Sequence, residues 1–261
     1  MSGPHLIKHQ QFPSRFLRNQ RDLIIYLPPG YHAQPYRQYP VLYLHDGQNL
    51  FDGSTSFIPG MDWHVGHTAD QCILESRVEP LIIIGIYNAG KQRIQEYTPT
   101  RIPRLGGGRA SRYARFLIEE VRPFLEYNYR ILPGTENTGI GGSSLGGLVS
   151  LFLGLRMPNV FGKIAALSPS VWWNQRVILR FAQAATVDPK PRVWLDIGTC
   201  EGGRIVEDVE RFRDILLTKG WQWDRDFHYE RVEGAEHNEA AWAQRVGPFL
   251  QFLFPAAGSR I

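Results

Sequence analysis

A serine flanked by glycines constrains the fold more than any other stretch of this 261-residue chain. Residues 137–140 are typical of a β-strand, residues 148–156 are typical of a helix, and Ser144 lies at the corner between them. The pattern Gly142-x-Ser144-x-Gly146 is that of a sharp strand-to-helix turn that exposes a serine hydroxyl. Glycine fits both flanking positions, because the backbone is crowded there and the serine is strained.

The same run could instead be a glycine-rich turn that binds phosphate. A phosphate-binding P-loop is not supported, because no Gly-Lys-Ser/Thr ending follows. Ser143 is in the wrong register, since the residue two positions later is Leu145 rather than glycine. Ser144 is therefore the candidate nucleophile.

Size and composition predict one domain over residues 1–261. A chain of this length with 43% hydrophobic residues can bury roughly 70–75% of its unfolded surface. The net charge of +4 is modest and its basic residues are dispersed, which argues against a nucleic-acid surface. No apolar run reaches the length of a signal peptide or membrane span, so we expect a soluble, cytoplasmic protein without a membrane partner.

Cysteine and histidine spacing predicts neither a cofactor nor a metal. Cys72 and Cys200 lie far apart without a CxxC pair, which suggests neither a disulfide framework nor structural zinc. His64 and His67 have no evident third ligand. The oligomeric state is left open.

Strand-like and helix-like segments alternate along the chain. The expected strands are residues 22–27, 40–45, 81–86, 138–142, 163–167, 192–197 and 227–232, and the expected helices are 111–127, 205–219 and 239–254. This alternation predicts an α/β fold with a mostly parallel sheet covered by helices on both faces. Reactive groups of such sheets lie beyond the carboxyl ends of the strands. That rule gathers residues 45–48, Ser144, 198–202 and 234–238 at one rim.

A serine nucleophile needs a histidine base that is oriented by a carboxylate, here in the order serine, acid, histidine. Only two histidines follow Ser144. His228 lies inside a predicted strand, whereas His237 lies in the loop after it, so His237 is the candidate base. Glu201 is the favoured acid because it follows the strand 192–197. Other acids stay open: Asp196 within that strand, and Glu207 and Asp208 in the next helix.

The oxyanion that forms during acyl transfer needs prepositioned donors, each worth about 3–4 kcal/mol. One is expected to be the backbone N–H of Leu145, directly after the nucleophile. The second should come from the loop after strand 40–45, with Gln48 favoured and Gly47 as the alternative. His45 and Asp46 are expected to shape this turn.

Several phrases resemble the "Putative esterase" family of α/β-hydrolases. They are YLPPGY at residues 26–31, PVLYLHDGQNLF at 40–51, RIQEYTPT at 93–100, GGSSLGG at 141–147 and SPSVWW at 168–173. The family includes siderophore, feruloyl and acetyl-xylan esterases, S-formylglutathione hydrolases and mycolyltransferases. The chain looks most similar to the single-domain, siderophore-esterase-like bacterial branch.

The resemblance implies an α/β-hydrolase fold, Ser144 as nucleophile, His237 as base and Glu201 at the acid position. Some members of the siderophore branch work with serine and histidine alone, so a dyad stays open. Trp172 and Trp173 fall where the family often lines its substrate pocket; core packing is the alternative.

A basic segment, residues 91–115, carries seven positive side chains and one acid, Glu96. The basic residues are Lys91, Arg93, Arg101, Arg104, Arg109, Arg112 and Arg115. We expect this segment to cross the rim and attract an anionic or multiply oxygenated ester such as a ferric catecholate siderophore, with Arg93 binding substrate. Arginines spread over a solvated loop are the alternative.

These features predict a serine carboxylesterase that acts on a small-molecule ester through an acyl-enzyme. An acyltransferase of the mycolyltransferase type would keep the acyl-enzyme and pass it to a sugar or alcohol. A catalytically silent binding protein on the same scaffold is the third possibility.

Overall fold

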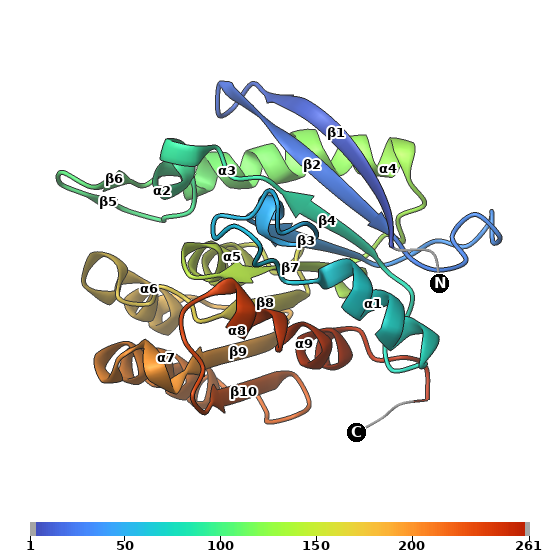
Figure 1. Ribbon diagram of the computed structural model, residues 1–261. Helices are drawn as coiled ribbons and strands as arrows, with labels where there is room; N and C mark the ends of the chain where they lie inside the picture. The colour runs from blue at the N-terminus through green and yellow to red at the C-terminus, as the bar shows by residue number, and fades with distance from the viewer. Residues whose placement is uncertain (1–3, 259–261) are drawn as a thin grey trace.

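The computed structural model describes residues 4–258. They form one eight-stranded sheet with helices packed around it (Figure 1). The strand order is β1-β2-β4-β3-β7-β8-β9-β10. The strands are β1 (His5–Ser14), β2 (Asn19–Leu27), β3 (Val41–His45), β4 (Ile82–Ile86), β7 (Thr138–Ser143), β8 (Lys163–Leu167), β9 (Arg192–Gly198) and β10 (Phe227–Val232). β1 and β2, and β2 and β4, pair antiparallel, whereas every other pair is parallel. The predicted mostly parallel sheet is confirmed.

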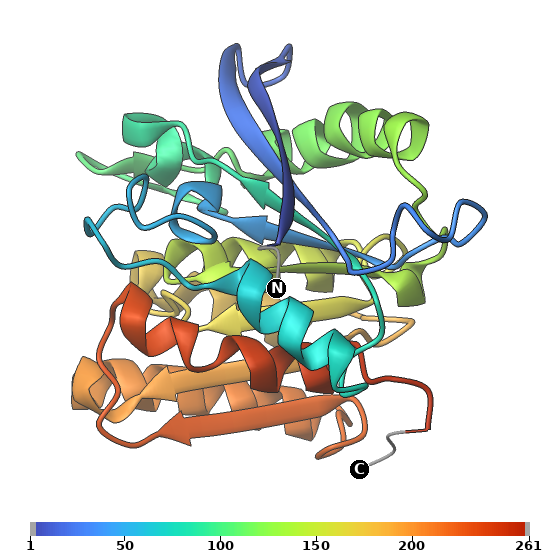
Figure 2. The ribbon, with the colours of Figure 1, turned by 45° about the vertical axis from the view of Figure 1, so that its right-hand side comes forward.

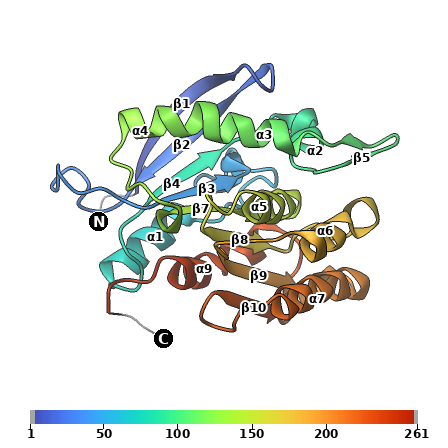
Figure 3. The ribbon, with the colours of Figure 1, turned by 180° about the vertical axis from the view of Figure 1, so that it is seen from behind.

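Helices cover both faces of this sheet. On one face lie α1 (Val65–Leu74), α8 (Glu239–Ala243) and α9 (Val246–Leu253), in front in Figure 2. The opposite face, in front in Figure 3, carries α3 (Ala110–Phe116), α4 (Arg122–Asn128), α5 (Leu145–Arg156), α6 (Trp173–Ala184) and α7 (Gly203–Thr218). The central parallel strands β3, β4, β7 and β8 are almost completely buried, because helices cover both of their faces. In β4, Ile82 and Ile84 pack with the second set of helices, and Ile83 packs with the first.

Shorter elements lie at the ends of the strands. The short helices are η1 (Gly47–Asn49), η2 (Gly90–Gln92), α2 (Arg93–Glu96), η4 (Thr135–Asn137) and η5 (Thr199–Glu201). A small hairpin of β5 (Arg101–Ile102) and β6 (Gly106–Gly107) projects beside α2 (Figure 1). Across residues 4–258, no helix has the length and apolar character needed to cross a bilayer.

Several elements differ from the sequence prediction, and α6 and the β5–β6 hairpin were not expected. β1 was not expected, because its mostly exposed side chains give no apolar pattern at the edge of the sheet. The helix expected at 111–127 contains a π-helical turn (Leu117–Val121) just before Pro123, which cannot donate a backbone hydrogen bond. The helix expected at 239–254 is two helices, α8 and α9.

Candidate active site

Ser144 occupies a strained corner between β7 and α5. Its φ of 57° and ψ of −121° lie in a region that residues with a side chain rarely adopt. A Cβ atom on Gly142 or Gly146 would lie 3.1 or 3.2 Å from Cβ of His45, so the two flanking glycines leave room for the turn. The corner has the geometry that the pattern predicted.

Two backbone hydrogen bonds tie this corner to the loop after β8. The N–H of Ser144 donates to the carbonyl oxygen of Leu167 (3.0 Å), and the N–H of Ser170 donates to that of Ser144 (2.9 Å). The Ser144 hydroxyl oxygen lies 3.3 Å from the Ser170 hydroxyl oxygen. Sequence analysis missed Ser170, because nothing in the local pattern links it to Ser144.

His237 and Glu201 contact each other at the ends of β10 and β9. Nδ1 of His237 lies 2.6 Å from Oε2 of Glu201. The Glu201 side chain is 0% exposed and that of His237 is 43% exposed. Burial would raise the pKa of Glu201, but hydrogen bonds from His237, Ser168 and the Gly198 N–H outweigh it and lower that pKa. A buried, ionised carboxylate therefore orients the imidazole.

Ser168 binds the carboxylate oxygen of Glu201 that does not contact His237. Its hydroxyl donates to Oε1 of Glu201 (2.6 Å) and accepts from the Trp242 indole N–H (3.1 Å) and Nη1 of Arg245 (2.9 Å). Ser168 begins the SPSVWW phrase, but only the fold shows that this residue after β8 holds a carboxylate after β9.

Asp196, the alternative acid, is part of this support and does not contact the histidine. Its Oδ1 accepts from Nη1 of Arg245 (2.5 Å) and from the backbone N–H of Ser168 (3.1 Å). Burial raises the pKa of Asp196 to about 6 despite these donors. Of the other candidates, Glu207 is exposed, and Asp208 pairs with Arg176.

Ser144 and His237 line the same cavity, whose volume is about 240 Å³. Its lining residues are Asp46, Gln48, Asn49, Phe57, Ile58, Asn88, Arg93, Ser143, Ser144, His237, Glu239 and Trp242. A larger cavity of about 980 Å³, between the loop after β2 and α1, is lined by none of the candidate residues. The candidate nucleophile and base therefore lie at the smaller cavity.

The turn after β3 brings Gln48 to this cavity. Asp46 begins η1 in a left-handed conformation (φ 57°, ψ 47°). A Cβ on Gly47 would lie 2.5 Å from the carbonyl carbon of Gly85, so only glycine lets the turn pack against β4. Gln48 lines the cavity, whereas Gly47 is buried beneath it.

Arg93 also lines the cavity, but its charge is already paired. Its Nε and Nη2 donate to the two carboxylate oxygens of Asp46, each at 2.8 Å. Nδ2 of Asn88 donates to the same carboxylate at 2.7 Å. Because this bidentate pair neutralises the guanidinium, Arg93 is not a free anion receptor.

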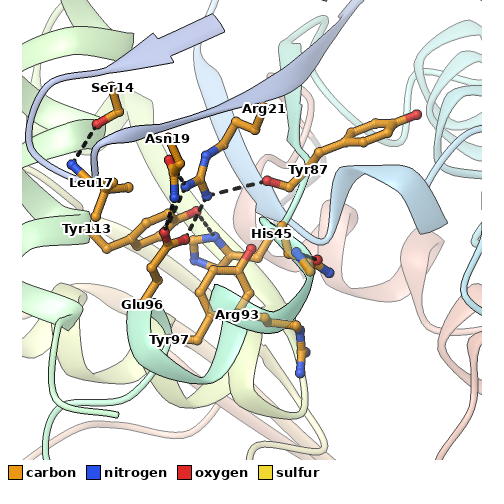
Figure 4. Close-up of polar contacts among 12 residues, drawn as sticks. Ser14, Leu17, Asn19, Arg21, His45, Tyr87, Arg93, Glu96, Tyr97 and Tyr113 are labelled. Atoms are coloured by element: carbon orange, nitrogen blue, oxygen red, sulfur yellow. Dashed lines mark hydrogen bonds and ion pairs between the residues drawn. The ribbon is translucent and has the colours of Figure 1, made fainter. Parts of the chain in front are cut away.

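A buried polar network lies behind the turn, and Figure 4 shows Asn19 and Arg21 converging on Glu96. Nη1 of Arg21 lies 2.9 Å from Oε2 of Glu96, and both side chains are almost completely buried. Tyr113 extends the network to His45, whose Nδ1 lies 3.0 Å from the phenol oxygen. Burial lowers the pKa of His45 to about 3, so the imidazole stays neutral. His45 and Asp46 therefore each have a polar partner at this turn.

The remaining candidates lie away from the cavity. Trp173 is buried in the core and its indole N–H donates to the carbonyl oxygen of Thr100 (3.0 Å). Trp172 is 45% exposed, and neither tryptophan is among the residues that line the cavity. Within the basic segment, every positive side chain except Arg93 is exposed on the surface. In residues 4–258 no group of three or more His, Cys, Asp or Glu residues could hold a metal.

Comparisons with known proteins place the chain in a family. The "Putative esterase" family model matches residues 14–252. The uncharacterized protein YbbA of Bacillus subtilis (strain 168) is 28% identical over 90% of this chain and 92% of its own length. The iron(III) salmochelin esterase of Escherichia coli O6:H1 is 28% identical over 77% of this chain, which spans 47% of that relative.

A solved structure supports the fold independently. The BES protein from Bacillus cereus superposes with a TM-score of 0.75 at 24% identity, over 97% of this chain and 95% of that one. The predicted α/β-hydrolase fold is confirmed. The chain belongs to the "Putative esterase" family and is a carboxylic ester hydrolase.

Proposed function

We propose that the protein cleaves carboxylic esters through an acyl-enzyme on Ser144, with His237 as general base and Glu201 as the orienting acid. The observation that carries this proposal is the 2.6 Å contact between His237 and Glu201, in a histidine that shares a cavity with Ser144. Such a constellation activates an otherwise weak nucleophile.

The proposed reaction begins when His237 takes the Ser144 proton. Glu201 holds Nδ1–H of the imidazole, which leaves Nε2 to accept the proton. Ser144 Oγ, released from Ser170, attacks the ester carbonyl. The backbone N–H groups of Leu145 and Gln48 stabilise the oxyanion. His237 then protonates the departing alcohol, and a water molecule that His237 activates hydrolyses the acyl-enzyme.

Exposure of the histidine favours hydrolysis over transfer to another acceptor. The 43% exposure of His237 allows bulk water to approach the base that must activate it. The substrate is proposed to be a siderophore-type or acylated-sugar ester. The salmochelin esterase relative supports the first class.

Replacement of the nucleophile tests the proposal. We expect Ser144→Ala to lower kcat/KM for a short-chain aryl ester by at least about 10³-fold, whereas Ser111→Ala, on the exposed start of α3, should leave it unchanged. Acetylated sugars, feruloylated sugars and catecholate siderophores, assayed beside this ester, identify the substrate class. Full activity of Ser144→Ala would refute the proposed mechanism.

A further inference from the structure

The wall of the catalytic cavity contains a buried carboxylate that the proposed reaction does not use. Glu239 lines the same cavity as Ser144 and His237 and is only 4% exposed. It begins α8, two residues after His237. Its Oε1 accepts a hydrogen bond from Nδ2 of Asn49 (3.1 Å).

Glu239 keeps unused hydrogen-bonding capacity. Its donors are the Asn49 amide and its own backbone N–H, whereas a carboxylate can accept about four hydrogen bonds. A buried acceptor is stabilised by every further donor that reaches it. A donor supplied by a bound substrate would therefore be favourable here.

The charges around Glu239 disfavour an anion. Asp46 and Glu239 bring two carboxyl groups to the cavity wall, and Arg93 is the guanidinium that faces them. Both oxygens of Asp46 are bound to Arg93, so Arg93 cannot also neutralise a substrate anion. Burial raises the pKa of Glu239 most, and the nearby charge of Asp46 raises it further; an incoming anion would also lose solvation and meet the charge of Asp46.

We propose that Glu239 binds a hydroxyl group on the alcohol part of the substrate and so selects esters whose alcohol part carries a neutral hydroxyl near the ester bond. The inference rests on the proposed function, in which His237 must protonate the oxygen of the departing alcohol. That alcohol therefore lies beside the loop that carries His237, and Glu239 follows His237 by two residues. Because Ser144, His237 and Glu239 line one cavity, we infer that a hydroxyl next to the ester bond reaches the wall that Glu239 contributes.

A purely structural role for Glu239 makes a different prediction. Asn49 uses its Oδ1 to accept from the backbone N–H of Phe57 (3.0 Å), so Glu239 and Asn49 also connect α8 to the loop at the cavity mouth. If Glu239 only holds α8 against this loop, its replacement would lower the hydrolysis rate of all esters by the same factor. A specificity role changes the ratio between two esters that differ only in the hydroxyl.

The test compares 2-hydroxyethyl butyrate with propyl butyrate, which have the same number of heavy atoms in the alcohol. Initial rates of acid release are measured for the wild type, Glu239→Gln, Glu239→Asp and the control Glu233→Gln, whose carboxylate is exposed before His237. We expect Glu239→Gln to lower the preference for the hydroxylated ester about tenfold, mainly through KM. Propyl butyrate should change less than about twofold. Glu239→Asp keeps the charge but shortens its reach, and should lose the same preference.

Two outcomes would overturn the inference: an equal loss on both esters in the Glu239 variants, or a wild type without preference for the hydroxylated ester. Hydrolysis of 4-nitrophenyl butyrate separates this result from failure of the proposed function. If Ser144→Ala still hydrolyses that aryl ester, the proposed function fails. If the hydrolysis depends on Ser144 and the hydroxyl preference is absent, only the role of Glu239 fails.

Discussion

Oε2 of Glu201 lies 2.6 Å from Nδ1 of His237, and the other oxygen of Glu201 is held by Ser168 and the backbone N–H of Gly198. Both carboxylate oxygens are therefore fixed before substrate binds. A buried carboxylate fixed in this way holds the imidazole in one tautomer and one orientation. The arrangement favours a triad over a dyad of Ser144 and His237.

Replacing Glu201 by Gln tests whether the acid matters. The amide cannot stabilise a positively charged imidazole, so we expect kcat to fall by about 10²–10⁴-fold with little change in KM. The matched control is Glu207→Gln, whose side chain is exposed on α7; it should leave kcat and KM unchanged. A loss below about threefold for Glu201→Gln, measured on the same aryl ester, would show that the site works as a dyad.

Ser168→Ala tests the support behind the acid. The change removes the donor to Glu201 and leaves the Trp242 indole N–H and Arg245 without this acceptor. We expect a loss of about 1–3 kcal/mol in the free energy of unfolding, measured by urea denaturation, and a roughly tenfold lower kcat. If Ser168→Ala keeps both the wild-type free energy of unfolding and the wild-type kcat, Ser168 does not support Glu201.

The core strands and the elbow could be predicted because they depend on local pattern. The apolar run of β4 and the glycines around Ser144 each carry their signal within a few residues. The placement of His237 beside Glu201 followed from one rule, that parallel strands end at one rim. Their roles in catalysis, the single domain and the cytoplasmic location stay predictions.

Long-range contacts away from the carboxyl ends of the strands could not be predicted. Arg21 and Glu96 form a buried ion pair across 75 positions, and the sequence shows only a basic residue just before an expected strand and an acid in a basic segment. The same holds for Arg93, which we expected to bind substrate and which the fold pairs with Asp46. Such pairings depend on which loops the sheet brings together.

Arg21→Met tests that ion pair. The variant leaves Glu96 buried without its guanidinium partner and with the Asn19 amide as a donor, so we expect the free energy of unfolding to fall by about 3–5 kcal/mol. Lys8→Met, which breaks a surface pair with Asp22, should cost less than about 1 kcal/mol. Adding Glu96→Gln to Arg21→Met should recover part of the loss, because no uncompensated charge then remains. If Arg21→Met lowers the free energy of unfolding no more than Lys8→Met does, the buried ion pair does not stabilise the fold as proposed.

His45 predicts a specific sensitivity to acid. Its pKa is about 3 in the fold and 6.5 in an unfolded chain, so only the unfolded chain binds the proton between these values. Stability is therefore intact above about pH 6.5 and is lost as the pH falls toward 3. Between pH 6.5 and 4.5 the contribution is about 2 kcal/mol. Urea titrations should show a shallower pH dependence for His45→Gln, and no such change for His32→Gln, whose side chain is exposed. If the free energy of unfolding depends on pH equally in the wild type, His45→Gln and His32→Gln, His45 is not buried in its neutral form.

Covalent labelling tests most directly whether His237 activates Ser144. The protein is incubated with an alkyl 4-nitrophenyl phosphonate, which traps an activated serine, and the adduct is located by peptide mass spectrometry. We predict one adduct, on Ser144, formed at least about 10²-fold more slowly in His237→Ala. An adduct on another residue, or labelling of Ser144 at the wild-type rate without His237, would contradict the account.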